Sequence, residues 1–245
     1  MKKLVIATAL ATLMVSAISI SAQTRSREDL LKDIETKRAE LNQLEKVFLA
    51  PSDEDRKAYA EFLRAPDTGL IRLLPRETYD DNANRDRQRV VTRGGGAYYS
   101  FTRLTHEYGY GSDIELSQDQ FTVGFAGADY GFITILGDVP LEKVSMETRA
   151  ANIFAAYNPP TEEPKVRLEQ RRFGMGADLQ GISVGRHIPM KLNTTYLLRS
   201  ICIDETDVLV AFRVVRIDSD RSAILLWKAL KRNPKPTMVR AERNW

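Results

Sequence analysis

The stretch "TTYLLRSICIDETDVLVAFRVVRIDSDRSAILLWKAL", Thr194 to Leu230, contains three strongly apolar runs that are rich in β-branched residues. The tetrapeptides DETD and DSDR separate these runs, and aspartate favours turns. Runs of this composition form strands, and such short links join antiparallel neighbours. The stretch therefore predicts a three-stranded antiparallel meander.

The middle run of this stretch is apolar on both of its alternating faces. One face carries Val208, Val210, Phe212 and Val214, and the other carries Leu209, Ala211 and Val215. A strand of this kind lies inside a sandwich or beneath a helix, because both of its faces must leave water.

Strand-like alternation also occurs upstream, where Phe121, Val123 and Phe125 alternate with polar or small residues. The turn sequence Gly127–Asp129 follows, and the apolar run Tyr130–Leu136 predicts a hairpin with the preceding strand. A single inserted helix is expected at Ser145–Tyr157, closed by the proline-rich sequence NPPTEEP, which is expected to be extended.

The N-terminal part is helical in pattern. Between Ser26 and Phe48, Leu30, Ile34, Lys37, Leu41, Leu44 and Phe48 recur at alternating spacings of four and three. Pro51 ends this helix, and Ser52 is placed to cap a second one. The pattern predicts a helical hairpin that folds onto itself or onto the core. The alternative is a homodimer through the N-terminal helix, against which Lys37 and a length of about three heptads weigh.

The predicted fold class is therefore α+β. An N-terminal helical hairpin precedes a predominantly antiparallel β-sandwich or barrel-like domain with one inserted helix. The expected boundaries are 1–22 for a signal peptide, 23–65 for the hairpin, 66–93 for a connector, 94–232 for the β-rich domain and 233–245 for a basic tail.

The first 22 residues have the layout of a secretory signal peptide. Lys2 and Lys3 precede the uncharged run Leu4–Ile20, and small residues follow. Cleavage is expected after Ser21 or Ala22, which makes the chain periplasmic or extracellular; the alternative is an uncleaved membrane anchor. Beyond residue 22 the sequence has no apolar stretch long enough for a stable membrane span.

Charge and cysteine content exclude some classes of function. The chain has 36 Lys and Arg against 33 Asp and Glu, and the signal removes two of the basic residues, so the mature chain is nearly neutral. It lacks the basic field that attracts nucleic acid, and no nucleic-acid partner is expected. Cys202 is the single cysteine, so an internal disulfide is impossible; its apolar neighbours predict a buried thiol.

The stretch "GGGAYYSFTRLTHEYGYGSDIEL", Gly94 to Leu116, carries the candidate site. Two tyrosines alternate with glycines and predict a surface loop, while two nearby carboxylates would share one face of a strand. The candidate ligand-binding residues are His106, Glu107, Tyr108, Tyr110, Asp113 and Glu115. The chain has only two histidines, so neither a metal site nor a cofactor is expected, and no residue is assigned as catalytic.

A second motif, "GISVG" at Gly181–Gly185, matches the nucleophile elbow G-x-S-x-G, and His187 follows it. An elbow needs a strand, a sharp turn and a helix, and Pro189 does not suit a helix start. The motif therefore does not predict a serine hydrolase.

Two functions remain open at this stage. The first is a non-catalytic binding module of the cell envelope or extracellular space, whose partner is an unknown protein or glycan. The second is an exported hydrolase that uses the carboxylate cluster around Glu107. An enzyme needs these side chains to converge in one concave site, whereas a binding module can spread them over a surface.

Export gives a first testable prediction. We expect the exported chain to begin near Ala22 or Gln23, because the small residues that follow the apolar run suit a signal peptidase. N-terminal sequencing or intact-mass spectrometry of the exported protein measures this. Recovery of residues 1–22 intact on membrane-bound protein would contradict it.

Overall fold

The computed structural model describes residues 25–77, 96–106, 108–109 and 111–239. The chain divides into two units, residues 1–45 and 46–245, and each is considered by itself. No helix within these described ranges is long and apolar enough to cross a membrane.

The first unit contains most of helix α1 (Arg27–Phe48). The hydroxyl of Ser26 accepts a hydrogen bond from the backbone N–H of Asp29 at 3.0 Å, and Glu28 and Asp29 place negative charge in the first turn. The predicted helix is thus confirmed almost residue for residue. Its pairing with a second helix as a hairpin stays a prediction.

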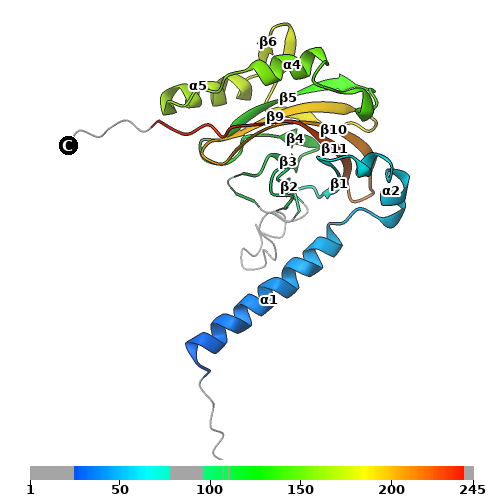
Figure 1. Ribbon diagram of the computed structural model, residues 1–245, viewed down its shortest axis with the longest axis vertical. Helices are drawn as coiled ribbons and strands as arrows, with labels where there is room; N and C mark the ends of the chain where they lie inside the picture. Colours follow the sequence, from blue (N-terminus) through cyan, green and yellow to red (C-terminus); the bar gives the residue numbers. More distant parts are fainter. Residues whose placement is uncertain (1–24, 78–95, 107, 110, 240–245) are drawn as a thin grey trace, which may run out of the picture. The chain divides into compact units, whose positions relative to one another are not determined.

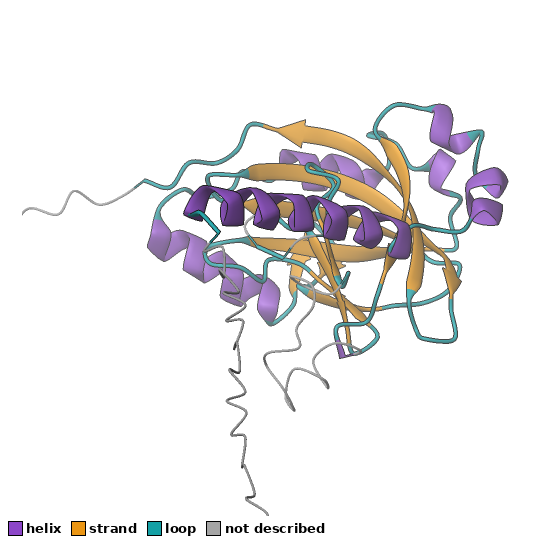
Figure 2. Ribbon diagram, turned by 90° about the horizontal axis from the view of Figure 1, so that it is seen from below, coloured by secondary structure: helices purple, strands orange, loops and turns teal. Residues whose placement is uncertain are grey.

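The second unit mixes helices with mostly antiparallel strands and is not a closed barrel. Five strands form a large sheet in the order β1-β11-β10-β9-β5, and every neighbouring pair is antiparallel. Seen from below, its strands run side by side and twist (Figure 2). They are β1 (Thr68–Leu73), β5 (Tyr130–Gly137), β9 (Thr195–Cys202), β10 (Thr206–Ile217) and β11 (Ala223–Asn233).

The remaining described strands form two smaller sheets. Four of them make a small sheet in the order β2-β3-β4-β8, and β6 pairs with β7. Figure 1 places the small sheet on one side of the large sheet and helices α4 and α5 on the other. The strands are β2 (Tyr98–Tyr99), β3 (Ile114–Ser117), β4 (Gln120–Thr122), β8 (His187–Pro189), β6 (Ala177–Leu179) and β7 (Ile182–Val184).

The predicted C-terminal meander is confirmed, since β9, β10 and β11 are consecutive antiparallel neighbours. The two aspartate-rich links form the turns between them. Asp204 and Arg221 adopt left-handed backbone conformations there, each with φ of 65°. Aspartate tolerates this conformation better than most residues, which agrees with its use in the first turn.

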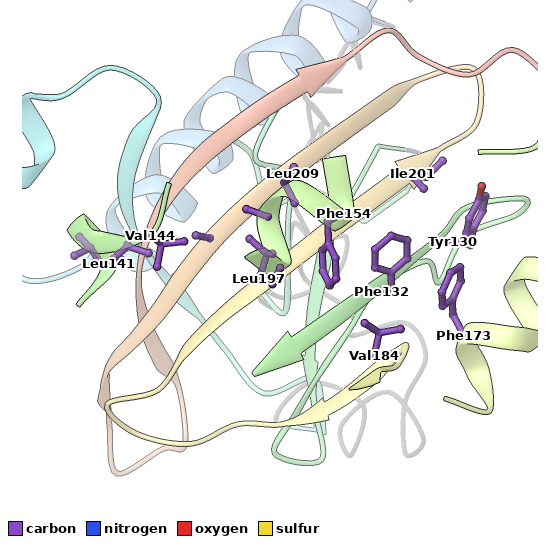
Figure 3. Packing of buried hydrophobic residues seen from close by; sticks show 14 of the residues in the cluster. Tyr130, Phe132, Leu141, Val144, Phe154, Phe173, Val184, Leu197, Ile201 and Leu209 are labelled. Carbon is purple, nitrogen blue, oxygen red and sulfur yellow. The ribbon is translucent and has the colours of Figure 1, made fainter. Parts of the chain in front are cut away.

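Both faces of β10 are buried, and each lies in a different hydrophobic core. Val208, Val210 and Phe212 belong to an inter-sheet core between the large and small sheets. Leu209 and Ala211 belong to a helix-side core on the opposite face. Figure 3 shows the helix-side core, where Phe154 of α4 and Phe173 of α5 meet Phe132 of β5. The strand predicted to lie inside a sandwich or beneath a helix thus has a sheet on one face and helices on the other.

Helices and short 3-10 turns cover the helix side of the large sheet. Tyr59, Phe62 and Leu63 pack there, as do buried side chains of α4 and α5. The N-cap predicted at Ser52 is confirmed, because its hydroxyl and the Asp55 carboxylate form a reciprocal capping box. The elements are α2 (Asp53–Ala58), η1 (Phe62–Arg64), η3 (Leu141–Lys143), α4 (Arg149–Ala156) and α5 (Glu163–Gly174).

Helix α5 corrects the expectation of one inserted helix. The sequence NPPTEEP was expected to be extended, yet the helix begins within it at Glu163, with Pro164 in its first turn. Proline is tolerated in the first turn because the backbone N–H that it lacks would have no acceptor within the helix at this position. Only Val166 and Phe173 are buried along α5, so the segment shows little apolar periodicity in the sequence.

The hairpin predicted around Gly127–Asp129 does not form. Strand β4 belongs to the small sheet and β5 to the large one, so the chain turns a corner between sheets. At this corner Gly124 has φ of 70°, and a Cβ there would lie 2.4 Å from the Tyr130 backbone. The actual hairpin joins β3 to β4, with Gln118 and Asp119 at positive φ.

Two segments expected to lie outside the β-rich domain contribute to it. Strand β1 falls within the predicted connector 66–93 and pairs with β11 along its whole length. In the predicted basic tail, the backbone N–H of Val239 donates to the Thr161 carbonyl at 2.9 Å, and the N–H of Met238 donates to the Asp204 carboxylate at 3.1 Å. The run "LIRLLP" was too short to predict an edge strand with a partner 150 residues away.

The inter-sheet core gives a prediction about stability. Phe212 is fully buried and packs against Phe121 and Tyr196, each with ring centroids 5.0 Å away. Phe212→Ala should lower the free energy of unfolding by about 3 to 5 kcal/mol through lost burial and a residual cavity. Denaturant melts measure this, with Leu168→Ala on the exposed side of α5 as the control. Equal losses in the two variants would show that this core is not the centre of stability.

Candidate functional site

The candidate site lies on the outer face of the small sheet. Side chains alternate along its strands, so Ile114, Leu116 and Phe121 enter the inter-sheet core while their neighbours point outward. Strand register aligns these outward residues in one row, which we call the outer-face row: Tyr98, Glu115, Thr122 and His187. Each member comes from a different strand.

Glu115 is the charged centre of this row. Its carboxylate accepts a hydrogen bond from the Tyr98 hydroxyl at 2.9 Å and one from the Arg76 guanidinium at 3.0 Å. The residue is only 4% exposed. Burial, followed by the neighbouring charge of Glu115, raises the pKa of Tyr98, so its hydroxyl stays protonated and donates. The glutamate is therefore a buried acceptor that is held by two internal donors.

An aromatic group adjoins Glu115 through Tyr98. The Tyr98 ring lies 4.8 Å from the ring of Tyr108 and 5.0 Å from that of Phe125, and Tyr108 and Phe125 are nearly parallel. Tyr108 is 50% exposed, whereas Tyr98 is buried. Rings at these distances hold one another in place, so Tyr108 presents a fixed aromatic surface to solvent.

The other end of the row is an imidazole. The Thr122 hydroxyl and the His187 Nδ1 lie 3.0 Å apart, and His187 is exposed. Desolvation and then Arg186 lower the pKa of His187, while Glu115 opposes them. The imidazole is therefore mainly neutral at physiological pH and can both donate and accept hydrogen bonds.

His106 lies elsewhere, against the edge of the large sheet. Its Nε2 is 2.9 Å from the carbonyl oxygen of Arg72, and its ring packs against Tyr99. Burial lowers the pKa of His106 to about 4, although the hydrogen bond to Arg72 opposes this. The imidazole is thus neutral and has a structural partner, and it does not join the outer-face row.

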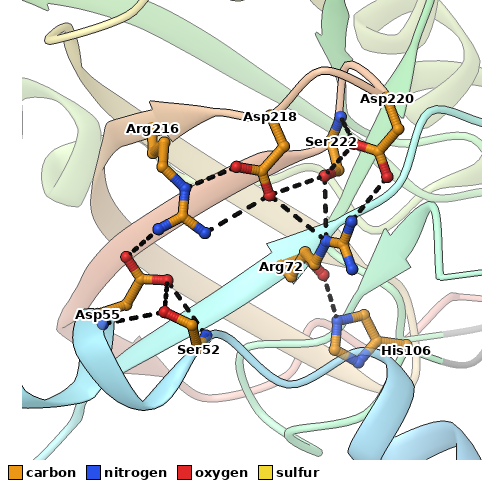
Figure 4. A network of polar contacts seen from close by, with 8 residues as sticks. All are labelled: Ser52, Asp55, Arg72, His106, Arg216, Asp218, Asp220 and Ser222. Carbon is orange, nitrogen blue, oxygen red and sulfur yellow. Dashed lines mark hydrogen bonds and ion pairs between the residues drawn. The ribbon is translucent and has the colours of Figure 1, made fainter.

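Figure 4 shows the polar network beside His106. The Arg72 guanidinium donates to Ser222 at 3.0 Å and to Asp220 at 2.6 Å. The Arg216 guanidinium donates hydrogen bonds to the carboxylates of Asp218 and Asp55. The Asp55 carboxylate is also part of the capping box of α2. These contacts tie the second helix to the β10–β11 turn, so we read this network as structural.

Asp113 belongs to a third environment, inside the inter-sheet layer. It is fully buried and accepts a hydrogen bond from the backbone N–H of Phe101 at 2.7 Å. Burial raises the pKa of Asp113 to about 6, although hydrogen bonds and the charge of Arg232 oppose the rise. Its partners differ from those of Glu115, so the two carboxylates do not act on a common group.

Asp129 and Cys202 complete a buried acid cluster with Asp113. Burial raises the pKa of Asp129 to about 7, and the charges of Asp113 and Glu205 add to the effect. Burial and the same two aspartates raise the pKa of the Cys202 thiol, which stays protonated. One oxygen of each aspartate is buried with no hydrogen-bond partner, an arrangement that favours the neutral acid.

The structure thus brings together two of the six predicted residues, Tyr108 and Glu115, with Tyr98 between them. His106 and Asp113 lie apart, and Glu107 and Tyr110 fall outside the described residues. The residues that the sequence did not reveal are Arg76, Tyr98, Thr122, Phe125, Asp129 and His187. Strand register brings three of them, Tyr98, Thr122 and His187, into one row with Glu115, and no local pattern in the sequence indicates that register.

The G-x-S-x-G match does not have the strand–turn–helix structure of a nucleophile elbow. Ser183 of the G-x-S-x-G match lies on β7, and the next element is strand β8 rather than a helix. Among the described residues, no group of three or more His, Cys, Asp or Glu side chains could hold a metal ion. Comparisons with protein-family models, curated proteins and solved structures found no match to this chain.

The buried acid cluster predicts an unusual dependence of stability on pH. The folded pKa values of Asp113 and Asp129 lie above the ordinary value of 3.8, so the folded chain keeps protons that the unfolded chain has released. Their contribution to stability is present at acidic pH and is lost as pH rises from about 4 through 7.

The variant Asp129→Asn isolates this effect. It should raise the free energy of unfolding at pH 8 by on the order of 1 to 3 kcal/mol and change it little at pH 4, because the amide is neutral at both. Denaturant melts across this range measure the difference, with the exposed Glu147→Gln as the control. An increase in the free energy of unfolding that is equal at pH 4 and pH 8 would argue against a protonated Asp129 in the folded chain.

Proposed function

We propose that this chain is an exported, non-catalytic binding module of the cell envelope or extracellular space. In this proposal a β-sandwich carries the binding surface on the outer face of its small sheet, and the partner is a protein or a glycan. Tyr108 is the central contact residue, supported by Tyr98 and Phe125.

The observation that carries the proposal is a contrast between two neighbouring side chains. Glu115 is buried and bonded to Arg76 and Tyr98, while Tyr108 exposes half of its surface above packed rings. An exposed, rigid tyrosine offers apolar contact area and a hydroxyl at a small cost in conformational entropy. The exposed His187 adds a neutral donor and acceptor at the end of the same row.

A hydrolase built on the same residues has less support. Paired carboxylates must both reach the scissile bond, but Asp113 is fully buried in a different environment from Glu115. Glu107 falls outside the described residues. The binding role needs only the surface that Tyr108 and its neighbours form.

Photo-crosslinking at position 108 tests the binding role. A benzophenone side chain replaces Tyr108 in the exported chain within the producing organism, and a second strain carries it at Met175, which is 84% exposed on the end of α5. We expect a discrete crosslinked product at 108 that is absent at 175. Mass spectrometry of that product identifies it as protein or glycan.

The isolated partner then allows a quantitative prediction. Tyr108→Ala should weaken binding roughly tenfold or more, since buried tyrosines often contribute more than 1 kcal/mol at interfaces. Titration calorimetry measures the affinity, and Met175→Ala is the control. Absence of a product at 108, or unchanged affinity in Tyr108→Ala, would refute this surface as the binding site.

A further inference from the structure

Helix α1 carries a narrow apolar stripe along its whole length. The stripe residues alternate at spacings of four and three, so equivalent positions return every seven residues, as in a coiled-coil seam. A face that packs on a sheet or a broad core is usually wider. In heptad notation, Ile34, Leu41 and Phe48 occupy a positions and Leu30, Lys37 and Leu44 occupy d positions.

We propose that α1 is a self-association surface on which a second copy of this chain packs as a parallel two-stranded coiled coil. An isolated helix of 22 residues is marginally stable in water, and it cannot bury its own stripe. A second copy supplies an identical stripe of the same length. This inference is independent of the binding role proposed for Tyr108.

Flanking charges favour the parallel orientation. In a parallel pair, Asp33 at a g position faces Arg38 at the following e position of the second copy. An antiparallel pair with the same a-to-d seam would instead place Arg38 against Arg38 and Glu40 against Glu40. The antiparallel pair therefore has two like-charge contacts where the parallel pair gains attraction.

The parallel pair also contains a like-charge contact between Glu40 and Glu45 of the second copy. Twofold symmetry repeats it once, as it repeats the attraction between Asp33 and Arg38, so the two kinds of contact offset one another, whereas both of these flanking contacts in the antiparallel pair are repulsive. The Lys37 ammonium lies 2.8 Å from the Glu40 carboxylate in the same helix and offsets that charge. The same contact draws Lys37 from the seam toward its flank. A two-stranded coil leaves this flank open to water, whereas a third strand would cover it, so a dimer suits Lys37 best.

Sedimentation equilibrium of the full chain at about 1 to 100 µM tests the association. We expect the average mass to rise with concentration from monomer toward dimer. Leu41→Lys, in the seam, should stay monomeric throughout, while Ala39→Lys, on the opposite side of the helix, should behave as the parent. Lys37→Leu should dimerise at roughly tenfold lower concentration or less, because it completes the apolar seam.

Disulfide trapping tests the orientation. Ile34→Cys should crosslink to itself under mild oxidation in a parallel pair, and the buried Cys202 should not interfere. Crosslinking only in a mixture of Ile34→Cys and Leu44→Cys would show an antiparallel pair and overturn the assignment. A monomeric parent chain at all concentrations, or equal effects of Leu41→Lys and Ala39→Lys, would overturn self-association. So would a Leu41→Lys variant that loses stability without a change in mass, since the stripe would then pack within its own chain.

Discussion

The fold depends on one strand that cannot tolerate water on either side. β10 buries Phe212 and its neighbours toward the small sheet and Leu209 and Ala211 toward the helices. A sheet with such a central strand needs a layer on both faces, and burial of each large apolar side chain contributes about 1.5 to 3 kcal/mol. The small sheet and the helices α4 and α5 are therefore consequences of the same constraint, although they come from separate segments of the chain.

A buried ion pair specifies where α4 sits on that sheet. Arg199 of β9 and Asp207 of β10 are at most 2% exposed and form two hydrogen bonds, at 2.9 and 2.7 Å. The Arg199 guanidinium also donates to the carbonyl oxygens of Phe154 and Tyr157 at the C-terminal end of α4, where positive charge is favourable. Such a pair contributes little net stability against an apolar substitute. Its four contacts instead fix one position of the helix end on the sheet.

The parts of the fold that the sequence predicted are those governed by local patterns. Helix α1, the cap at Ser52, the meander and the two-sided strand all follow from spacing within one segment. The hairpin at Gly127–Asp129 was wrong because adjacent strands can enter different sheets, and the sequence does not encode that choice locally. Helix α5 was missed because only Val166 and Phe173 face the core. The site follows the same rule, since Tyr98 and Glu115 meet only through the pairing of β2 with β3.

The two buried clusters of ionisable side chains differ in how completely their polar atoms are hydrogen-bonded. Arg199 and Asp207 hydrogen-bond to one another, so each of these buried side chains has a partner of opposite charge. Asp113 and Asp129 each keep one buried carboxyl oxygen without a hydrogen-bond partner, which favours the protonated acid. Asp113 immediately precedes β3, the strand that carries Glu115 into the outer-face row. The acid cluster therefore lies two residues along the chain from the outer-face row. It also adjoins the helix-side core, because Asp129 directly precedes Tyr130 and accepts a hydrogen bond from the backbone N–H of Ile203.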